Sequence, residues 1–427
     1  MKNKFSLHPV LSAAYVSVCR AFYFSFFILH FSFLSAQMTV GQWRAHFAYH
    51  NATQCATLAG KIYVVSDGSL YSYCPADSYL DIYNKVTLLS DQGIRYLRRC
   101  DDENLLLIIY ENANIDLLYP DETIVNLPDF YQKSTFDPEI RDVTISGSYA
   151  YLTSTFGVVV INLKKKEFTN TYRLNEDIVS CTGNNYYIVC STLRGLIIGK
   201  KSDNLLDPAN WNLLNDSYFS KLVSFEGNFY GLRPSKGVFN ITASNAITPF
   251  IEGNFVNLNT TDGRMYATAA DNSIYVIQHK SDTSAEKLIF PGFSTLNDIT
   301  LSDNLWWTAS GSDGLIGYKK EGNNLTASVT GLIPDSPMRN YCDFIQFTPD
   351  ERLLVAGGCL DYFGTTSYPG TVAILTDDGG ARIEGTLTGV AHLHPDLDAD
   401  VEHSDGDQAL EDVPFAGTLL VESDRLD

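Results

Sequence analysis

Short apolar and aromatic stretches alternate with polar turns along most of the chain. A representative unit is AYLTSTFGVVVINL at residues 150–163, in which an apolar stretch, small hydroxyl residues and a glycine precede a β-branched run. Runs of about four to eight such residues, bounded by Gly, Asn, Asp or Ser, are typical of β-strands, and two of them around a short turn form a hairpin. The pattern predicts an all-β protein.

The same unit returns at a nearly constant spacing. Its first strand carries an aromatic or apolar anchor residue, and successive anchors are roughly 36 to 47 residues apart. Several strands per unit at a period of about 40 to 45 residues are typical of β-propeller blades, whereas a β-helix repeats at shorter intervals. We expect the anchors at equivalent positions of inner strands: Tyr63, Ile108, Tyr151, Tyr187, Tyr230, Tyr266, Trp307 and Leu354.

Seven of these units fill residues 38–330, and an eighth begins near residue 336. The eighth unit either closes an eight-bladed ring or opens a second propeller. Pro334 and Pro337 indicate a linker between the seventh and eighth units. We therefore predict a seven-bladed β-propeller at residues 37–330, followed by the first blade of a second, incomplete propeller at residues 331–380.

Two further expectations concern the inside of a blade. The apolar segments 85–90 (KVTLLS) and 178–181 (IVSC) should supply outer strands. A glycine should begin the strand that follows the hairpin turn, where the chain bends tightly near the propeller axis and a Cβ atom would not fit. The glycines in this position are Gly157, Gly195, Gly237 and Gly314.

The first 36 residues have the pattern of a signal peptide. They contain Lys2, Lys4 and Arg20 but no acidic residue, then an apolar core at residues 21–34, and then LSA before Gln37. A transmembrane anchor is the alternative, but this core is shorter than the ~20 residues that a spanning helix needs. We expect cleavage after Ala36 and export through the periplasm to the outer-membrane cell surface.

The charge balance is strongly acidic. The whole chain has 30 basic and 50 acidic residues, for a net charge of −20. Such a surface repels nucleic-acid phosphate, so we expect no nucleic-acid partner. Residues 381–427 lack the blade pattern, and this acidic segment is predicted to be a disordered or aberrant tail. A solvated charge run is favoured over a metal site for its imidazoles and carboxylates, which are His392, His394, Asp396, Asp398 and Asp400.

Local motifs for catalysis are absent from the sequence. There is no G-x-S-x-G, no HExxH, no P-loop and no dinucleotide-binding glycine motif. We therefore assign no catalytic residue, no metal ligand and no cofactor, although a site assembled from loops of several blades would escape motif searches. For Asn112, Asn114 and Asp116, a polar turn is favoured over a calcium site.

Aromatic and cysteine residues are interpreted as packing groups. We expect the following aromatic residues to lie between blades rather than to form a sugar platform: Trp43, Tyr49, Trp211, Trp306 and Trp307. Seven cysteines follow the predicted signal peptide, without a CxxC motif, so at least one thiol is free or paired between molecules. Buried single thiols are the favoured interpretation for these cysteines: Cys55, Cys74, Cys100, Cys181, Cys190, Cys342 and Cys359.

Several phrases taken together resemble one known family. They are W-x-x-H-x-x-Y at residues 43–49, KVTLLSDQGI at 85–94, YENANIDLL at 110–118, YLTSTFGVVV at 151–160 and NLLDPANW at 204–211. As a set they resemble the PorZ family, the β-propeller surface components of the type IX secretion system of Bacteroidetes, over about residues 38–378. Each phrase alone also resembles the propellers of two-component sensor proteins.

The resemblance implies a role at the cell surface. Proteins of the PorZ family have two seven-bladed propellers and a C-terminal β-sandwich, and they act with the sortase PorU and with PorV and PorQ. That complex removes the C-terminal signals of cargo proteins and joins the cargo to anionic lipopolysaccharide. The resemblance therefore implies a non-enzymatic scaffold or binding subunit, with a two-component sensor propeller and a propeller hydrolase or lyase as alternatives.

Two features qualify this resemblance. The sequence departs from the family after about Asp377, as a truncated or frameshifted chain would. Direct contact with lipopolysaccharide would need a local basic cluster such as Arg95, Arg98 and Arg99, because the overall surface is acidic. Contact with protein partners is therefore the favoured task of this region.

Overall fold

The computed structural model describes residues 45–130, 139–282, 284–322, 324–340, 344–347, 353–357, 370–375 and 381–387. Within these ranges, 32 strands form eight four-stranded sheets, and consecutive strands are neighbours in every sheet. Several expectations concern residues outside the described ranges: the signal peptide, Trp43, Cys342, Cys359, and the histidines and aspartates of residues 392–400.

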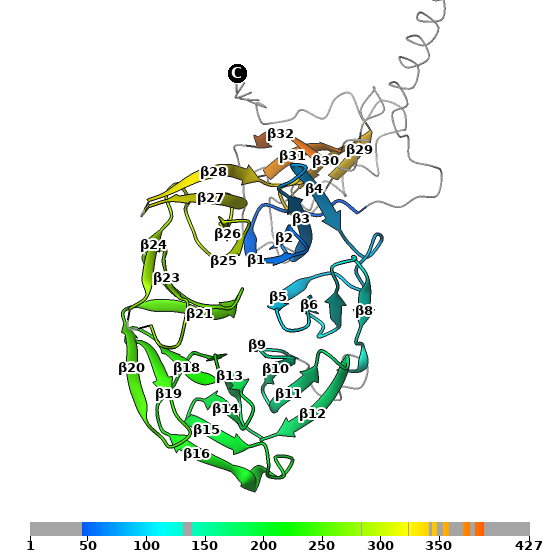
Figure 1. Cartoon of the computed structure of the whole chain (residues 1–427). Helices are drawn as coiled ribbons and strands as arrows, with labels where there is room; N and C mark the ends of the chain where they lie inside the picture. The colour runs from blue at the N-terminus through cyan, green and yellow to red at the C-terminus, as the bar shows by residue number, and fades with distance from the viewer. Residues whose placement is uncertain are drawn as a thin grey trace, which may run out of the picture.

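Seven of the sheets are the blades of a propeller (Figure 1). The first three blades comprise β1 (Ala52–Leu58), β2 (Lys61–Ser66), β3 (Ser69–Cys74) and β4 (Tyr79–Tyr83); β5 (Ile94–Cys100), β6 (Leu105–Tyr110), β7 (Ile115–Leu118) and β8 (Ile124–Asn126); and β9 (Asp142–Ser146), β10 (Tyr149–Ser154), β11 (Gly157–Asn162) and β12 (Glu167–Arg173).

The next two blades have the same four-strand order. The fourth comprises β13 (Ile178–Gly183), β14 (Tyr187–Thr192), β15 (Gly195–Lys200) and β16 (Trp211–Asn215), with a 3-10 helix, η1 (Pro208–Asn210), before β16. The fifth comprises β17 (Lys221–Phe225), β18 (Asn228–Arg233), β19 (Gly237–Ile241) and β20 (Ile247–Glu252).

The last two blades complete the ring. They comprise β21 (Phe255–Thr261), β22 (Arg264–Ala269), β23 (Ser273–Ile277) and β24 (Glu286–Ile289), and β25 (Asp298–Ser302), β26 (Leu305–Ala309), β27 (Leu315–Glu321) and β28 (Asn324–Leu332). The first strand of each blade lies innermost and the fourth lies at the rim, as β12, β16 and β20 show in Figure 1.

The ring closes between the first and seventh blades. Ala52, at the start of β1, exchanges two backbone hydrogen bonds of 2.9 Å with Gly311, which lies between β26 and β27. Strand β1 also packs against β25 and β26. The predicted seven-bladed propeller is confirmed, and the eighth unit is not part of this ring.

The eighth sheet follows the ring and lies outside it (Figure 1). It comprises β29 (Phe344–Phe347), β30 (Leu353–Gly357), β31 (Gly370–Leu375) and β32 (Ala381–Leu387), in the sequential order of a blade. Asn340, which precedes this sheet, accepts a 2.6 Å hydrogen bond from the Ala48 backbone N–H and donates to the Asp67 carbonyl at 3.2 Å. The segment after the ring thereby returns to the first blade.

The predicted start of the acidic tail at residue 381 is too early. Residues 381–387 form β32, which pairs antiparallel with β31 from Ala381 opposite Leu375 to Leu387 opposite Gly370. The boundary was placed where the blade-like pattern of apolar residues ends. An edge strand can form without that pattern, because its backbone pairs with one neighbouring strand only.

Most anchor residues occupy the predicted equivalent position. Each is the third residue of the second strand of its blade and is at most 2% exposed: Tyr63, Tyr151, Tyr230, Tyr266 and Trp307. Three anchors were misplaced. Tyr187 is the first residue of β14 and Ile108 is the fourth of β6, and the equivalent residues are Val189 and Leu107. Leu354 is the second residue of β30, where Val355 is the equivalent residue. An apolar residue without an aromatic ring fills this position in the second and fourth blades, so alignment on an aromatic anchor fails there.

The prediction that a glycine begins the strand after the hairpin turn is confirmed in three blades, but the predicted reason, crowding near the propeller axis, is wrong. Gly157, Gly195 and Gly237 begin the third strands β11, β15 and β19, with φ between +126° and +148°. A Cβ atom on them would lie 1.9 to 2.2 Å from a carbonyl oxygen of the segment that contains the fourth strand. The close neighbour is therefore the outer part of the blade, and not the axis. Gly314 lies one residue before β27, at φ +71°.

Both segments predicted as outer strands lie elsewhere. Residues 85–90 are turn and loop, because the Asn84 side-chain oxygen accepts from the backbone N–H groups of Val86 (2.8 Å) and Thr87 (3.2 Å). Residues 178–181 belong to β13, an innermost strand. Apolar residues of this strand pack against the neighbouring blades, as Ile178 and Cys181 do in the cluster between the third and fourth blades.

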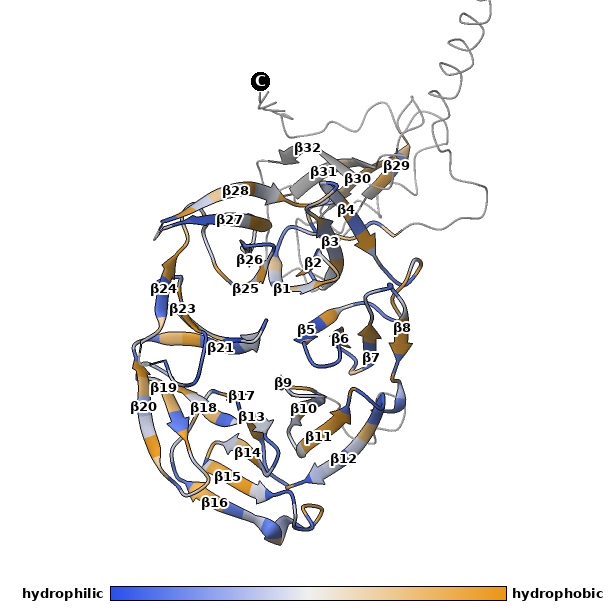
Figure 2. Ribbon diagram, in the orientation of Figure 1, coloured by the Kyte–Doolittle hydropathy of each residue, from blue (hydrophilic) through white to orange (hydrophobic). Residues whose placement is uncertain are grey.

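The hydrophobic core consists of seven clusters, one between each pair of adjacent blades. The third strands β7 and β11 are among the most hydrophobic segments, as Figure 2 shows, and every residue of both is buried. Because each blade contributes to two clusters, each blade is held by both neighbours. No helix in the described part of the chain is long and apolar enough to cross a membrane.

Candidate binding site

One register position of the innermost strands carries a polar side chain in every blade. Each of these residues lies opposite the fifth residue of the second strand. We call this set the axial ring: Gln54, Tyr96, Asp142, Ser180, Lys221, Asn257 and Asp298. Sequence reasoning missed it. The sequence signal for the axial ring is a polar residue in the first strand of each blade, opposite the fifth residue of the second strand. This signal becomes visible only when the two strands are aligned in register.

Hydrogen bonds of the axial ring join five of the seven pairs of adjacent blades. Gln54 accepts from the Leu97 N–H at 2.9 Å, and Tyr96 donates to the Arg141 carbonyl at 2.6 Å. Three further links join other adjacent blades: Ser180 donates to the Asp142 carboxylate at 2.6 Å, the Leu222 N–H donates to Ser180 at 2.9 Å, and the Cys55 N–H donates to Asp298 at 3.2 Å.

The axial ring contains buried charges. Lys221 of the fifth blade forms an ion pair with Asp142 of the third, across the intervening Ser180, and the two side chains are only 13% and 10% exposed. Burial lowers the pKa of Lys221 and raises the pKa of Asp298 to about 6. These groups are enclosed and already hydrogen-bonded, which leaves them little capacity for a ligand.

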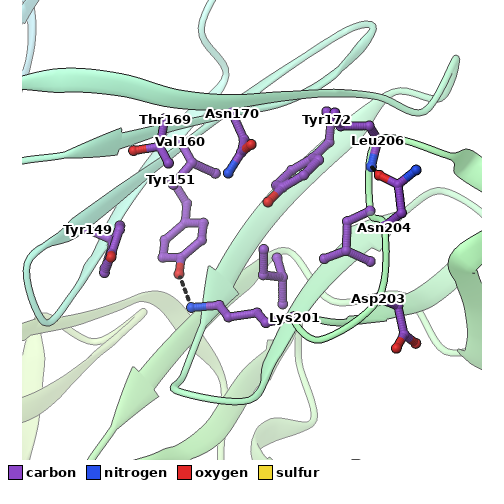
Figure 3. Close-up of a pocket in the computed structure, with 12 residues that line it drawn as sticks. Tyr149, Tyr151, Val160, Thr169, Asn170, Tyr172, Lys201, Asp203, Asn204 and Leu206 are labelled. Atoms are coloured by element: carbon purple, nitrogen blue, oxygen red, sulfur yellow. Dashed lines mark hydrogen bonds between the residues drawn. The ribbon is translucent and has the colours of Figure 1, made fainter.

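An open pocket lies between the third and fourth blades. Its volume is about 340 Å³. Strands β10, β11, β12 and β14 and the loop at residues 201–206 line it with Tyr149, Tyr151, Val160, Thr169, Asn170, Tyr172, Ile188, Lys201, Asp203, Asn204, Leu205 and Leu206 (Figure 3). We call this the Lys201 pocket.

Lys201 is the cationic group of the pocket. Its ammonium group donates a 3.0 Å hydrogen bond to the Tyr151 hydroxyl and lies 5.3 Å and 5.7 Å from the ring centroids of Tyr149 and Tyr151 (Figure 3). Burial lowers its pKa. In contrast to Lys221, it forms no ion pair with a carboxylate within the described ranges.

The loop that carries Lys201 is fixed at its far end. Leu205 is 4% exposed, and its carbonyl accepts a 3.0 Å hydrogen bond from the Trp211 indole. The Asn204 carbonyl accepts a 2.8 Å bond from the Asn210 side chain. A cation, two tyrosine faces and the amides of Asn170 and Asn204 thus surround a concave space, which suits a small polar ligand that carries negative charge.

The three arginines proposed for lipopolysaccharide do not form a shared basic site. All lie on β5, but each has its own partner. Arg95 pairs with Glu139 at 3.3 Å, Arg98 donates to Gln54 at 2.7 Å, and Arg99 pairs with Asp101 at 3.1 Å. Carboxylates thus pair with Arg95 and Arg99, and neutral oxygen atoms hold the Arg98 guanidinium group.

The other candidate residues have structural roles. The Asn112 side chain accepts from the Asn114 N–H at 2.9 Å, as expected for a turn, while Asp116 is fully buried and accepts from the Tyr110 hydroxyl at 2.6 Å. No cluster of His, Cys, Asp or Glu suited to a metal occurs among the residues described. The predicted aromatic packing is confirmed by ring contacts for Tyr49, Trp211, Trp306 and Trp307.

A model of the PorZ N-terminal β-propeller domain of the type IX secretion system matches residues 62–212. The resemblance to PorZ is confirmed. The matched range runs from β2 to the start of β16, so the whole Lys201 pocket lies in the PorZ-like part.

A solved structure of PorZ has the same fold. PorZ of Porphyromonas gingivalis, described as an essential surface component of the type IX secretion system, is 23% identical with a TM-score of 0.69. That match covers 81% of this chain and 46% of PorZ, so the chain spans about half the length of that protein. The extracellular domain of a one-component system protein of B. thetaiotaomicron is 12% identical with a TM-score of 0.43, over 79% of this chain and 53% of that one. A comparison with curated proteins gave no match.

Proposed function

We propose that the chain is an exported, non-enzymatic surface subunit of a type IX secretion system. In this role it binds the sortase PorU and its partners PorV and PorQ, and it assists the removal of cargo signals and the attachment of cargo to anionic lipopolysaccharide. The observation that carries the proposal is the PorZ domain match at residues 62–212, inside a propeller that superposes on PorZ over 81% of the chain.

The architecture suits a binding role. A closed ring with a hydrophobic cluster between every two blades holds many short loops in fixed positions on its two faces. The acidic composition favours partners with basic surfaces over nucleic acid. For an anionic saccharide we favour the Lys201 pocket over the arginines of β5, because Lys201 has no carboxylate partner in the described part of the chain and those arginines have polar partners.

A pull-down from cell envelopes tests the partner proposal. The tagged full chain should recover PorU, PorV or PorQ from detergent extracts of a bacterium that has a type IX system, and an unrelated tagged propeller should recover none. Circular dichroism of the purified bait establishes that it is folded. A folded chain that recovers no member of the complex would overturn the proposed role.

N-terminal sequencing of the envelope-associated protein tests export separately. We expect the mature chain to begin at Gln37, because the basic and apolar segments before LSA have the order of a signal peptide. An intact Met1 on the envelope-associated protein would contradict cleavage.

A further inference from the structure

Two cysteines of the fourth blade lie face to face. Cys181 on β13 and Cys190 on β14 are directly opposite in the antiparallel pair, their sulfur atoms are 3.0 Å apart, and both residues are fully buried. The other described thiols have no such neighbour. Their sulfurs contact oxygen atoms instead, in Cys55, Cys74 and Cys100.

The geometry of this pair is close to that of a disulfide. Residues directly opposite in antiparallel strands have Cα atoms about 4.5 or 5.5 Å apart, and both values lie within the range that disulfides span. The sulfurs need to approach by only ~1 Å to reach bonding distance, which small side-chain rotations provide. The backbone can therefore stay as it is.

We propose that Cys181 and Cys190 become joined by a cross-strand disulfide when the chain folds in an oxidising compartment. The inference rests on the proposed function in one respect, because such a compartment requires export. Each thiol loses one proton, and together they lose two electrons. The oxidant is a protein disulfide of the thiol–disulfide oxidoreductase class, which is reduced to a dithiol through a mixed disulfide.

The location of the pair determines when the bond forms. Both side chains belong to the hydrophobic cluster between the third and fourth blades, together with Tyr151 and Tyr172, which line the Lys201 pocket. Burial raises the pKa of the Cys181 thiol, so the thiolate needed for exchange is scarce in the folded protein. The bond must form before these two blades close, and reductants should reach it only after unfolding. Once formed, it fixes β13 to β14 under the pocket.

Refolding of the full chain tests the inference without mutation. The reduced, denatured chain is refolded in a mixture of oxidised and reduced glutathione, denatured again, alkylated without reductant and digested for mass spectrometry. We expect Cys181 and Cys190 in one linked species, two hydrogens lighter than the two thiols, while Cys55, Cys74 and Cys100 carry the alkyl group. Alkylation of both Cys181 and Cys190 after refolding would overturn the inference, whatever the compartment of the protein.

A second arm separates this inference from the proposed function. The same alkylation is applied to protein taken directly from cells that express the full chain from its own gene. Linked Cys181 and Cys190 in this sample support both proposals. If the pair links during refolding but is alkylated in the cellular sample, the disulfide inference stands and the proposed export is overturned.

Two cysteine variants test whether Cys181 and Cys190 are the residues that form the disulfide. In Cys190→Ala, Cys181 should become fully alkylated. In the matched control Cys100→Ala, which removes another fully buried thiol, the bond between Cys181 and Cys190 should remain. A Cys181 that still resists alkylation in Cys190→Ala has a different partner, which would overturn the assignment.

Discussion

Two lysines of this propeller are partly removed from water, and they differ in their partners. Lys221, on the axis, is buried and forms an ion pair with Asp142, while Lys201, in the open pocket, faces two tyrosine rings and has no carboxylate partner in the described ranges. Burial lowers the pKa of both. The interior of the ring pairs Lys221 with a carboxylate, so removal of one partner would leave the other charge buried alone. Lys201 instead faces the open pocket.

Replacement of the two lysines by methionine should give the largest contrast. Lys221→Met leaves the Asp142 carboxylate buried without its cation, and such a loss destabilises proteins by about 3 to 5 kcal/mol. Lys201→Met breaks no ion pair, so the free energy of unfolding should change by less than about 1 kcal/mol. Denaturant unfolding of both variants measures the difference.

A double variant checks the cause. Adding Asp142→Asn to Lys221→Met removes the unpaired charge, so part of the lost free energy of unfolding should return. Equal destabilisation by Lys221→Met and Lys201→Met would break the comparison between axis and pocket.

The second prediction concerns the pH dependence of the axial ring. Asp298 is enclosed, and burial raises its pKa from 3.8 to about 6. Its protonated form is therefore favoured in the folded state, and this contribution to the free energy of unfolding is fully present below pH ~4 and lost as the pH rises through about 6. The shift corresponds to about 3 kcal/mol.

The variant Asp298→Asn isolates this effect, because asparagine does not titrate. The free energy of unfolding of the wild type, relative to this variant, should fall by about 3 kcal/mol between pH 3 and pH 7. Urea unfolding at several pH values measures it. A difference that is constant over this range would show that Asp298 titrates normally and that the axis is hydrated.

The third prediction extends the comparison to the backbone. Gly157 has φ +148°, and a Cβ there would lie 1.9 Å from the Tyr172 carbonyl oxygen. Gly227 has φ +81° with open space around its Cα atom. Both alanine variants incur backbone strain, but only Gly157→Ala also forces β11 and β12 apart. It should lower the free energy of unfolding by about 1 to 3 kcal/mol more than Gly227→Ala, by thermal or urea unfolding.

The fold was predictable because it depends on a repeated local pattern. Hairpins with a buried anchor recur in every blade of the ring, and in five blades an aromatic anchor identifies the second strand: Tyr63, Tyr151, Tyr230, Tyr266 and Trp307. The errors came where one blade departs from the consensus, as at Val189, which replaces the aromatic ring. Composition also misled, since 85–90 is apolar and yet forms a turn set by Asn84.

The candidate site was not predictable, because it depends on distances between blades. Lys201 follows Tyr151 by 50 residues, yet their side chains meet because the third and fourth blades pack face to face. The axial ring shows the same limitation, since Asp142 and Lys221 are 79 residues apart. Local motifs do not reveal such pairs, because the packing of separate blades brings the two residues together.

The last prediction has the smallest effect on stability and concerns the pocket alone. Tyr151→Phe removes the hydroxyl group that accepts from Lys201, and it keeps the ring that packs between the blades. The free energy of unfolding should change by at most about 1 kcal/mol, the usual value of one hydrogen bond. Lys201→Met should likewise leave the fold intact, but it removes the cation of the pocket. Binding of purified anionic lipopolysaccharide to the full chain should therefore weaken at least about tenfold, as measured by surface plasmon resonance. Arg95→Met is the matched control, because it removes a cation already paired with Glu139 and should leave this affinity unchanged. Equal losses in the two variants would show that overall charge governs binding and that the pocket has no special part in it.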